Sequence, residues 1–135
     1  MNFIDKAFES NLSGDDFLQA MADIYSEPEV REILDKYPQF VKDVILIIDY
    51  DYEIQMEGLD NVIYGHFGEQ LPEILKAMDN CGASNEADVL RQAKAMTPEE
   101  YDENYDVLCD KLAIHNDYES FWDLVRNYID ASLNA

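Results

Sequence analysis

The segment from residue 39 to residue 57 is the most apolar stretch of the chain, and it constrains the fold more than any other feature. Its apolar residues recur at three- and four-residue steps and lie on more than one side of a helix, which is typical of a helix enclosed by others. Pro38 precedes the segment and Gly58 follows it, and both residue types delimit helices. We therefore predict a central apolar helix with the rest of the chain packed around it.

Helix-start signals divide the rest of the sequence into further amphipathic segments. Ser13 and Ser84 are residues of the type that caps the start of a helix, and Gly82 is predicted to cap the end of one in a left-handed conformation. The sharpest signal is Thr97-Pro98-Glu99-Glu100, which combines a capping threonine, a proline at the first helical position and a glutamate three residues after the cap. It predicts a helix that reaches about residue 115, and no segment shows the two-residue period of a strand. We predict an all-α fold, a compact bundle of about six to seven helices that forms a single domain over residues 1–135.

The charge of the chain is strongly one-sided. The chain has 30 Asp and Glu residues and nine Lys and Arg residues, which gives a formal net charge of −21. A net charge of roughly 2–8 already keeps a small domain soluble, and a larger excess destabilises the compact state by self-repulsion. Binding to nucleic acid or to an anionic membrane requires clustered Lys and Arg, so we predict neither as a partner. The negative net charge favours a basic protein as the partner. A metal ion or a cationic small molecule remains an open alternative.

Five carboxylates of the helix that begins at Pro98 fall within about 100° of one another on a helical wheel. They are Glu99, Asp102, Glu103, Asp106 and Asp110, hereafter the acidic stripe. They span roughly 16 Å, or about one charge per 4 Å, close to the ~3.4 Å phosphate spacing of a single DNA strand. Lys111 is the only basic residue between Lys94 and Arg126. Because like charges at this spacing repel by roughly 0.2–0.5 kcal/mol per pair, the uncompensated stripe predicts a partner-binding surface.

A second acidic ridge is formed by residues at steps of four, four and three: Asp49, Glu53, Glu57 and Asp60. It makes one surface only if the helix continues past Gly58. Both acidic sets also fit the ordinary solvated faces of an acidic protein. We predict that they bind a partner, because their repulsion is concentrated and lacks compensating lysines.

The sequence offers little support for catalysis or metal binding. The run Asp49-Tyr50-Asp51-Tyr52-Glu53 resembles the start of a calcium loop, but Ile54 stands where that loop needs glycine. His66 and His115 lack the three or four ligands of a zinc site. No phosphate-binding glycine loop, nucleophile elbow or dinucleotide fingerprint occurs. We predict no catalytic residue, no metal site and no cofactor, and a metal-dependent enzyme that uses clustered carboxylates is the weakest alternative.

The features that bear on location are all negative. Cys81 and Cys109 are too few for a disulfide scaffold, and we expect them to be small core residues. The first residues do not form a charged-then-apolar signal peptide. The longest purely aliphatic run, residues 44–48, is far shorter than the roughly 20 residues that span a bilayer. We therefore expect a cytoplasmic protein.

The stretch from residue 53 to residue 93 resembles the DNA-mimic protein family of small acidic bacterial proteins. That family has a segment Glu-Val-x-Asn-Gly-Gly-Phe-x-Gln followed by aromatic residues, then a glycine loop, an amphipathic helix, an Ile-Gly-Ala-like turn and a helix of Ala and Leu. The counterparts here are, in order, Glu53-Ile54-Gln55-Met56-Glu57-Gly58-Leu59-Asp60-Asn61-Val62-Ile63-Tyr64, Gly68, Leu75-Lys76-Ala77-Met78, Cys81-Gly82-Ala83 and Ala87-Asp88-Val89-Leu90. The aromatic residues near the C-terminal end are similar as well: Tyr118, Phe121, Trp122 and Tyr128. The sequence departs from the family at Met56, Glu57 and Asn61, where the family has asparagine, glycine and glutamine.

This resemblance implies a helical, often dimeric protein whose carboxylates imitate backbone phosphates. Such a protein occupies the DNA-binding face of a basic regulator, for example one of the helix-turn-helix type. Together with the acidic stripe, it predicts a DNA-mimic-like inhibitor. An immunity protein that neutralises a cationic toxin or nuclease uses the same electrostatics, and the sequence does not separate the two. A homodimer also stays open, because the aromatic residues could cover an interface or fill one core.

Overall fold

The computed structural model describes all residues from 1 to 135 and contains only helices, without any strand. This confirms the predicted all-α class. The nine α-helices and three 3₁₀ helices exceed the predicted six to seven, because short segments such as α1 and α8 carry little periodic signal. The elements are α1 Phe3–Glu9, α2 Gly14–Met21, η1 Ala22–Tyr25, η2 Pro28–Lys36, α3 Gln39–Glu57, α4 Leu59–Ile63, η3 His66–Gln70, α5 Leu71–Asn80, α6 Ser84–Ala95, α7 Pro98–Lys111, α8 Ala113–Asn116 and α9 Tyr118–Leu133.

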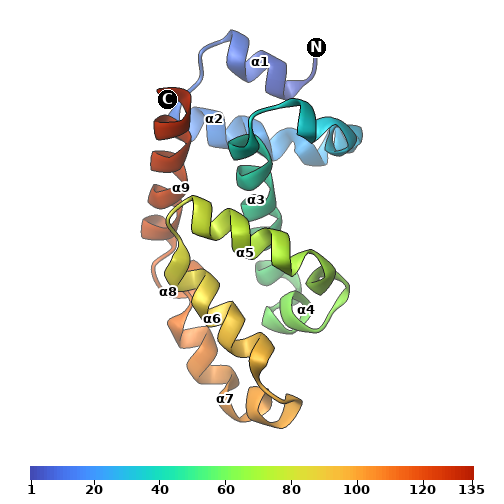
Figure 1. Ribbon diagram of the computed structural model, residues 1–135, viewed down its shortest axis with the longest axis vertical. Helices are drawn as coiled ribbons and strands as arrows, with labels where there is room; N and C mark the ends of the chain where they lie inside the picture. Colours follow the sequence, from blue (N-terminus) through green and yellow to red (C-terminus); the bar gives the residue numbers. More distant parts are fainter.

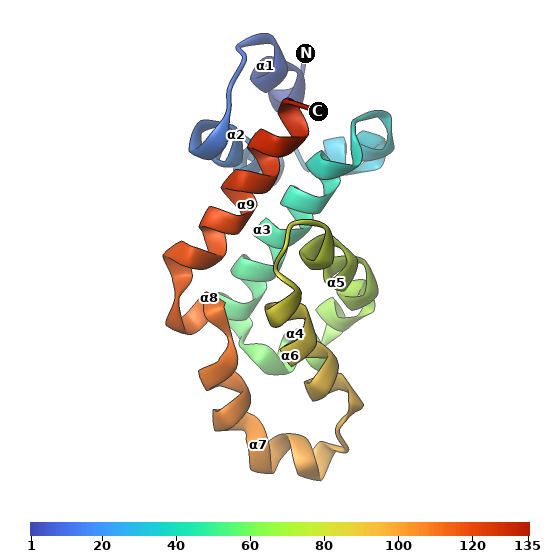
Figure 2. The same ribbon diagram turned by 60° about the vertical axis from the view of Figure 1, so that its left-hand side comes forward.

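The helices are arranged along one long axis. The chain termini and α1 lie at one end of this axis, and α7 lies at the other (Figures 1 and 2). α9 runs beside α3, so the last helix packs against the middle of the chain. No helix combines the length and the apolar character needed to cross a bilayer. The elongated arrangement leaves α7 with neighbours on one side only.

The helix α3 lies at the centre of the fold, as predicted. It packs against α2, α4, α5, α9, η1 and η2. The side chains of Val41, Val44, Ile45 and Ile47 are completely buried and cover more than one side of the helix. The apolar run of the sequence is therefore explained by contacts around most of the circumference of α3.

A buried carboxylate joins α3 to two of its neighbours. Asp43 is 1% exposed and accepts hydrogen bonds from Tyr128 Oη of α9 at 2.6 Å, from Gln39 Nε2 at 2.9 Å and from Asn80 Nδ2 of α5 at 3.1 Å. Three donors satisfy this carboxylate without a basic residue, as a buried polar group requires. The packing of α5 and α9 on α3 is thus fixed by directional bonds as well as by apolar contact.

Two of the predicted helix ends are confirmed in detail. Thr97 Oγ1 accepts from the Glu100 N–H at 3.2 Å, and Glu100 Oε1 accepts from the Thr97 N–H at 3.0 Å, which completes the predicted capping box of α7. Gly82 has φ +86° and ends α5, with the Ala83 N–H bonded to the Met78 carbonyl at 2.8 Å. This left-handed glycine is the predicted C-terminal cap.

The two predicted serine caps differ from the structure. Ser13 holds the N-cap position of α2, but its side chain makes no capping bond. Instead, the Gly14 N–H donates to Asp130 Oδ1 of α9 at 2.7 Å, so the last helix caps an early one. Ser84 is the first residue of α6, and Ala83 takes the cap position. In both cases the helix start was predicted to within one residue and the capping bond was wrong.

The capping box of α7 yields a stability prediction. Replacing Thr97 with alanine removes the Oγ1 acceptor, so we expect the free energy of unfolding to fall by about 1 kcal/mol. Thr97→Ser keeps the acceptor and is expected to stay within about 0.5 kcal/mol of the native chain. Urea titrations of the three proteins, followed by circular dichroism, measure the difference. Equal stability of the alanine and serine variants would show that the cap does not stabilise α7.

Candidate functional site

The inner face of α7 is anchored by aromatic residues. Tyr101 is 2% exposed, and its hydroxyl donates to Asp60 Oδ1 of α4 at 2.6 Å. Its ring meets those of Tyr64 and Tyr105 edge to face, at centroid distances of 5.0 and 5.8 Å. Leu108, two turns further along the helix, is buried as well. Tyr101 and Leu108 thus hold this face of α7 against the core, which turns the opposite face to solvent.

The far end of α7 is held through a buried glutamate. Glu86 of α6 is 3% exposed and accepts from the Ala113 N–H at 2.7 Å, the Ile114 N–H at 3.2 Å and Tyr50 Oη at 2.9 Å. These bonds connect α6 and α3 to the start of α8, directly after α7 ends at Lys111. Glu86 therefore holds the C-terminal end of α7 in place relative to α3 and α6.

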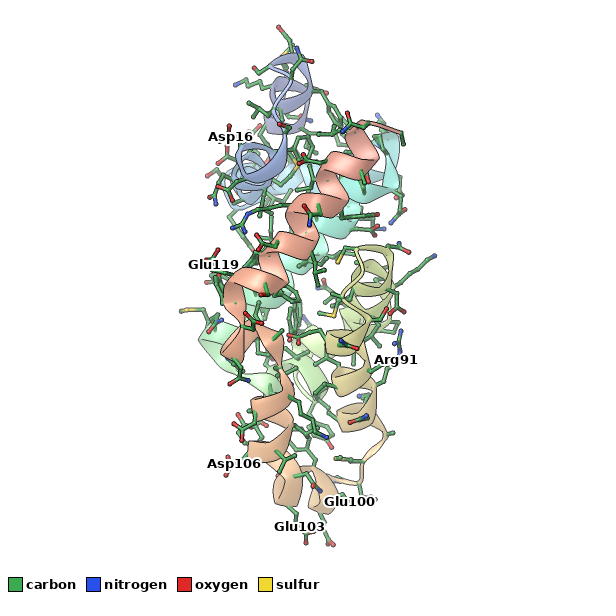
Figure 3. All side chains as sticks on the ribbon, turned by 90° about the vertical axis from the view of Figure 1, so that its left-hand side faces the viewer. Asp16, Arg91, Glu100, Glu103, Asp106 and Glu119 are labelled. Carbon is green, nitrogen blue, oxygen red and sulfur yellow. The ribbon has the colours of Figure 1, made fainter.

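All five residues of the acidic stripe lie on the outer face of α7 and are exposed. None of them lies within 4.0 Å of a Lys or Arg nitrogen, since every ion pair of the chain involves Arg31, Lys42, Arg91 or Arg126. Lys111 lies in the last turn of α7 and makes no ion pair. Figure 3 shows Glu103 and Asp106 at the lower end of the molecule, where α7 lies. Arg91 lies on the side of the molecule opposite Asp106. The stripe is therefore solvent-exposed and uncompensated.

The C-terminal end of α7 is also capped without a cation. Asn116 Nδ2 donates to the carbonyl oxygens of Cys109 and Asp110 at 2.9 Å each and of Leu112 at 2.8 Å. An amide thus takes the place that Lys or Arg often occupies at the end of a helix. The predicted single helix to residue 115 is consequently divided at Leu112, whose backbone is extended.

The second acidic ridge is not the continuous free surface that the sequence suggested. Asp49 is 6% exposed, and both of its oxygens accept from Arg31, at 2.7 and 2.8 Å, while Tyr25 Oη donates to Oδ1 at 2.6 Å. Gly58, with φ +82°, ends α3 and separates Glu57 from the residues of α4. The arginine that neutralises Asp49 lies on η2. A helical wheel of α3 shows only residues of α3, so it could not reveal this pairing.

The other members of the second acidic ridge have separate surroundings. Glu53 is half-buried and accepts from Asn61 Nδ2 at 2.7 Å. Asp60 is exposed but accepts the hydrogen bond of Tyr101. Glu57 is exposed and has no ion pair. Within this ridge, a cation therefore neutralises Asp49 alone, and the other three carboxylates keep their negative charge.

One protein family matches most of the chain. The match to the DMP19-like proteins extends over residues 35–132, from the end of η2 through nearly all of α9. The chain belongs to the DMP19-like family. This is a non-enzymatic family of DNA-mimic proteins, in agreement with the resemblance found in the sequence. No curated protein and no solved structure matches the chain.

The matched residues of this DMP19-like chain contain the whole candidate surface. They include the acidic stripe, the tyrosines that anchor α7 and the Glu86 contacts. The first two α-helices and η1 lie outside the match. The family assignment and the exposed carboxylates thus concern the same part of the molecule.

The His and Cys residues of this DMP19-like chain are the ones considered as metal ligands and nucleophiles in the sequence, and the structure gives their surroundings. No three residues among His, Cys, Asp and Glu are placed to hold a metal ion. Burial raises the pKa of the Cys81 thiol to about 11, so this side chain is a thiol, not a nucleophilic thiolate, near neutral pH. Its S–H donates to the Met78 carbonyl at 3.4 Å. Cys81 is a core residue, as predicted.

Glu86 gives the DMP19-like chain a defined pH dependence. Burial raises the pKa of Glu86 above its ordinary value of 4.5, although the N–H groups of Ala113 and Ile114 and the Tyr50 hydroxyl counteract part of this rise. At pH values between the pKa of Glu86 in the unfolded chain and its higher pKa in the folded chain, Glu86 is protonated more often in the folded chain. Its contribution to stability is therefore complete below the unfolded value and is lost as the pH rises through the folded value.

We accordingly expect a difference between the native chain and Glu86→Gln in the pH window directly above 4.5. As the pH rises through this window, the contribution of Glu86 to the free energy of unfolding of the native chain should decrease. The glutamine variant should show no such decrease. Asp79 and Glu100, whose pKa values are lowered by Arg91 and by the Thr97 cap, contribute equally in both proteins. Urea titrations across this window measure the difference, and parallel pH profiles would contradict the assignment.

Proposed function

We propose that this DMP19-like chain is an inhibitor that occupies the DNA-binding surface of a basic regulator. The observation that carries the proposal is the acidic stripe, which is exposed and free of ion pairs at one end of the molecule. Lys and Arg of a DNA-binding protein normally contact phosphates, and these contacts position the protein on the duplex. Carboxylates at about one per 4 Å offer a comparable row of negative charges to the same side chains.

The rigidity of α7 supports this role. Its two ends are fixed by the Thr97 capping box and by Asn116, and its inner face is fixed by Tyr101 and Leu108. A rigid row of charges loses little conformational freedom when it binds, whereas a flexible acidic tail must be ordered first. Preorganised carboxylates can therefore imitate the fixed geometry of a nucleic-acid backbone.

Electrostatic complementarity also determines how binding should respond to salt. Surfaces of opposite charge attract each other before contact and so raise the association rate. Salt weakens this attraction, because it screens exposed charges beyond about 8 Å at physiological ionic strength. We expect the complex with the regulator to weaken steeply as salt increases.

Affinity capture tests the proposal. The chain is immobilised through its N-terminus, which lies at the end of the molecule opposite α7 (Figure 1). An extract of the native cell is then passed over it at low salt. We expect a basic DNA-binding protein to be retained, and to be released both by higher salt and by duplex DNA. Retention of proteins that duplex DNA does not release would contradict mimicry, and capture of a cationic toxin would favour an immunity role.

A further inference from the structure

One side of α3 carries a site that is built around a guanidinium group, and the chain's own Arg31 fills it. Asp49 is buried and accepts from both terminal guanidinium nitrogens of Arg31, at 2.7 and 2.8 Å, in the two-point geometry typical of arginine with a carboxylate. The guanidinium carbon lies 5.8 Å from the ring centre of Tyr25, whose hydroxyl donates to Asp49 Oδ1 at 2.6 Å. The ring of Tyr52 lies 5.4 Å from that of Tyr25. The charge and the aromatic rings of this site suit an arginine side chain.

The guanidinium site opens to solvent through a cleft of about 280 Å³. Tyr25, Tyr52 and Glu53 line this cleft together with Arg31 and Asp49. Both tyrosines are half-exposed, and Arg31 is exposed as well. Glu53 accepts from Asn61 through Oε2, and its Oε1 accepts from no donor of the chain. A side chain of another molecule therefore has access to the place that Arg31 occupies.

The segment that carries Arg31 is lightly attached to the rest of the protein. η2 is a 3₁₀ helix of nine residues, although 3₁₀ helices longer than three or four residues are uncommon because their hydrogen bonds have poorer geometry. Only Ile24, Val30 and Leu34 of η1 and η2 are buried. Segments with few buried apolar contacts open locally at a lower free energy than the core. Local opening of η1 and η2 would release Arg31 while α3 stays folded.

We infer that Arg31 is an intramolecular occupant of an arginine site, and that an arginine of the basic partner takes its place at Asp49. The incoming guanidinium makes the two bonds to Asp49 and lies against the exposed ring of Tyr52. This inference rests on the proposed function for the basic nature of the partner. It adds to that function a contact that is selective for arginine, because the compact ammonium of lysine cannot make the planar two-point contact.

The ion pair of Arg91 provides a contrast within the same chain. Arg91 contacts Asp79 and Asp88, which are both exposed. Loss of Arg91 would leave these two carboxylates hydrated. Loss of Arg31 would leave the buried Asp49 with the Tyr25 hydroxyl as its only donor, which is costly for a buried charge. Only the second change therefore creates a need for a new cation.

The site can be tested by removing its occupant and adding a small probe. Arg31→Gln empties the site, and the probe is N-acetyl-arginine-amide, followed through the backbone amide resonances of residues 49–53 in an NMR spectrum. We expect saturable binding with a dissociation constant on the order of millimolar. The native chain should bind at least about 10-fold more weakly, because its site is free in only a fraction of the molecules. No saturable shift in Arg31→Gln would overturn the inference.

Two comparison compounds test the chemistry of the contact. N-acetyl-citrulline-amide has the shape of the probe without its charge, and N-acetyl-lysine-amide has the charge without the planar group. We expect both to bind Arg31→Gln markedly more weakly than the arginine compound. Equal binding of all three compounds would show that the site does not recognise a guanidinium.

Two further variants locate the binding. Arg91→Gln removes the same charge from an exposed ion pair and should bind N-acetyl-arginine-amide no better than the native chain does. The double variant Arg31→Gln and Asp49→Asn should lose the binding that Arg31→Gln gained. Equal gains in Arg31→Gln and Arg91→Gln, or full binding by the double variant, would overturn the assignment to Asp49.

Hydrogen exchange of the native chain tests the release of Arg31 even if the variant does not fold. We expect the amides of η1 and η2 to exchange at least about 10-fold faster than the buried amides of α3. N-acetyl-arginine-amide should speed their exchange further, because it binds the open form, and N-acetyl-lysine-amide should have much less effect. Equal protection of η2 and α3 would contradict the proposed release.

The outcome is separate from that of the proposed function. Arginine binding by Arg31→Gln without capture of a DNA-binding protein would leave the site assigned and reject the inhibitor function. Capture without arginine binding would support the inhibitor function and reject the site.

Discussion

Replacing Glu86 with alanine is expected to lower the free energy of unfolding by about 3–5 kcal/mol. The substitution leaves the N–H groups of Ala113 and Ile114 and the hydroxyl of Tyr50 without their acceptor, and it opens a space between α6 and α8. For a chain of this size the midpoint of thermal unfolding should fall by roughly 10–15 °C. Urea and thermal titrations followed by circular dichroism measure both quantities.

The matched control is Glu103→Ala, the same chemical change at an exposed position of α7 that has no ion pair. We expect its free energy of unfolding to stay within about 0.5 kcal/mol of the native value, as is usual for surface substitutions. A similar loss in both variants would mean that the contacts of Glu86 do not organise the region around α7.

The variant with Glu99→Gln, Glu103→Gln and Asp106→Asn is expected to bind the captured partner roughly 3- to 150-fold more weakly. This range follows from about 0.2–1 kcal/mol for each of three exposed charge pairs. Most of the loss should lie in the association rate, and the dependence of affinity on salt should become shallower. Surface plasmon resonance at several salt concentrations measures the rate constants and their slopes.

A charge-matched control removes the same net charge at a distance from α7. Asp23, Glu29 and Glu32 are exposed, make no ion pair and lie on η1 and η2. Asp23→Asn, Glu29→Gln and Glu32→Gln should reduce affinity far less than the substitutions in the stripe. An equal loss would show that the partner responds to total charge only, and not to the arrangement on α7.

The parts of the fold that could be predicted from the sequence are those set by local interactions. The capping box at Thr97 and the glycine cap at Gly82 depend on residues within one or two turns of a helix. The central position of α3 follows from its apolar composition, and the outward face of α7 follows from periodicity. Contacts between distant segments were not accessible. Asp49 looked like part of a free ridge because Arg31, 18 residues away, is brought to it only by the packing of η2 on α3.

Glu86 was missed although the sequence held a hint. It precedes Val89, Leu90 and Ala93 by three, four and seven residues, so it falls on the apolar face of α6. A charged residue in such a position is either exposed at the edge of the face or buried with partners.

The most direct test of the account is whether the captured partner can hold this chain and duplex DNA at once. Sedimentation velocity with labelled DNA, purified partner and increasing chain measures all species together. We predict that the chain displaces the DNA without forming a ternary complex, and that the stripe variant needs more protein to do so. A stable ternary complex of chain, partner and DNA would contradict the claim that the acidic stripe occupies the DNA-binding surface.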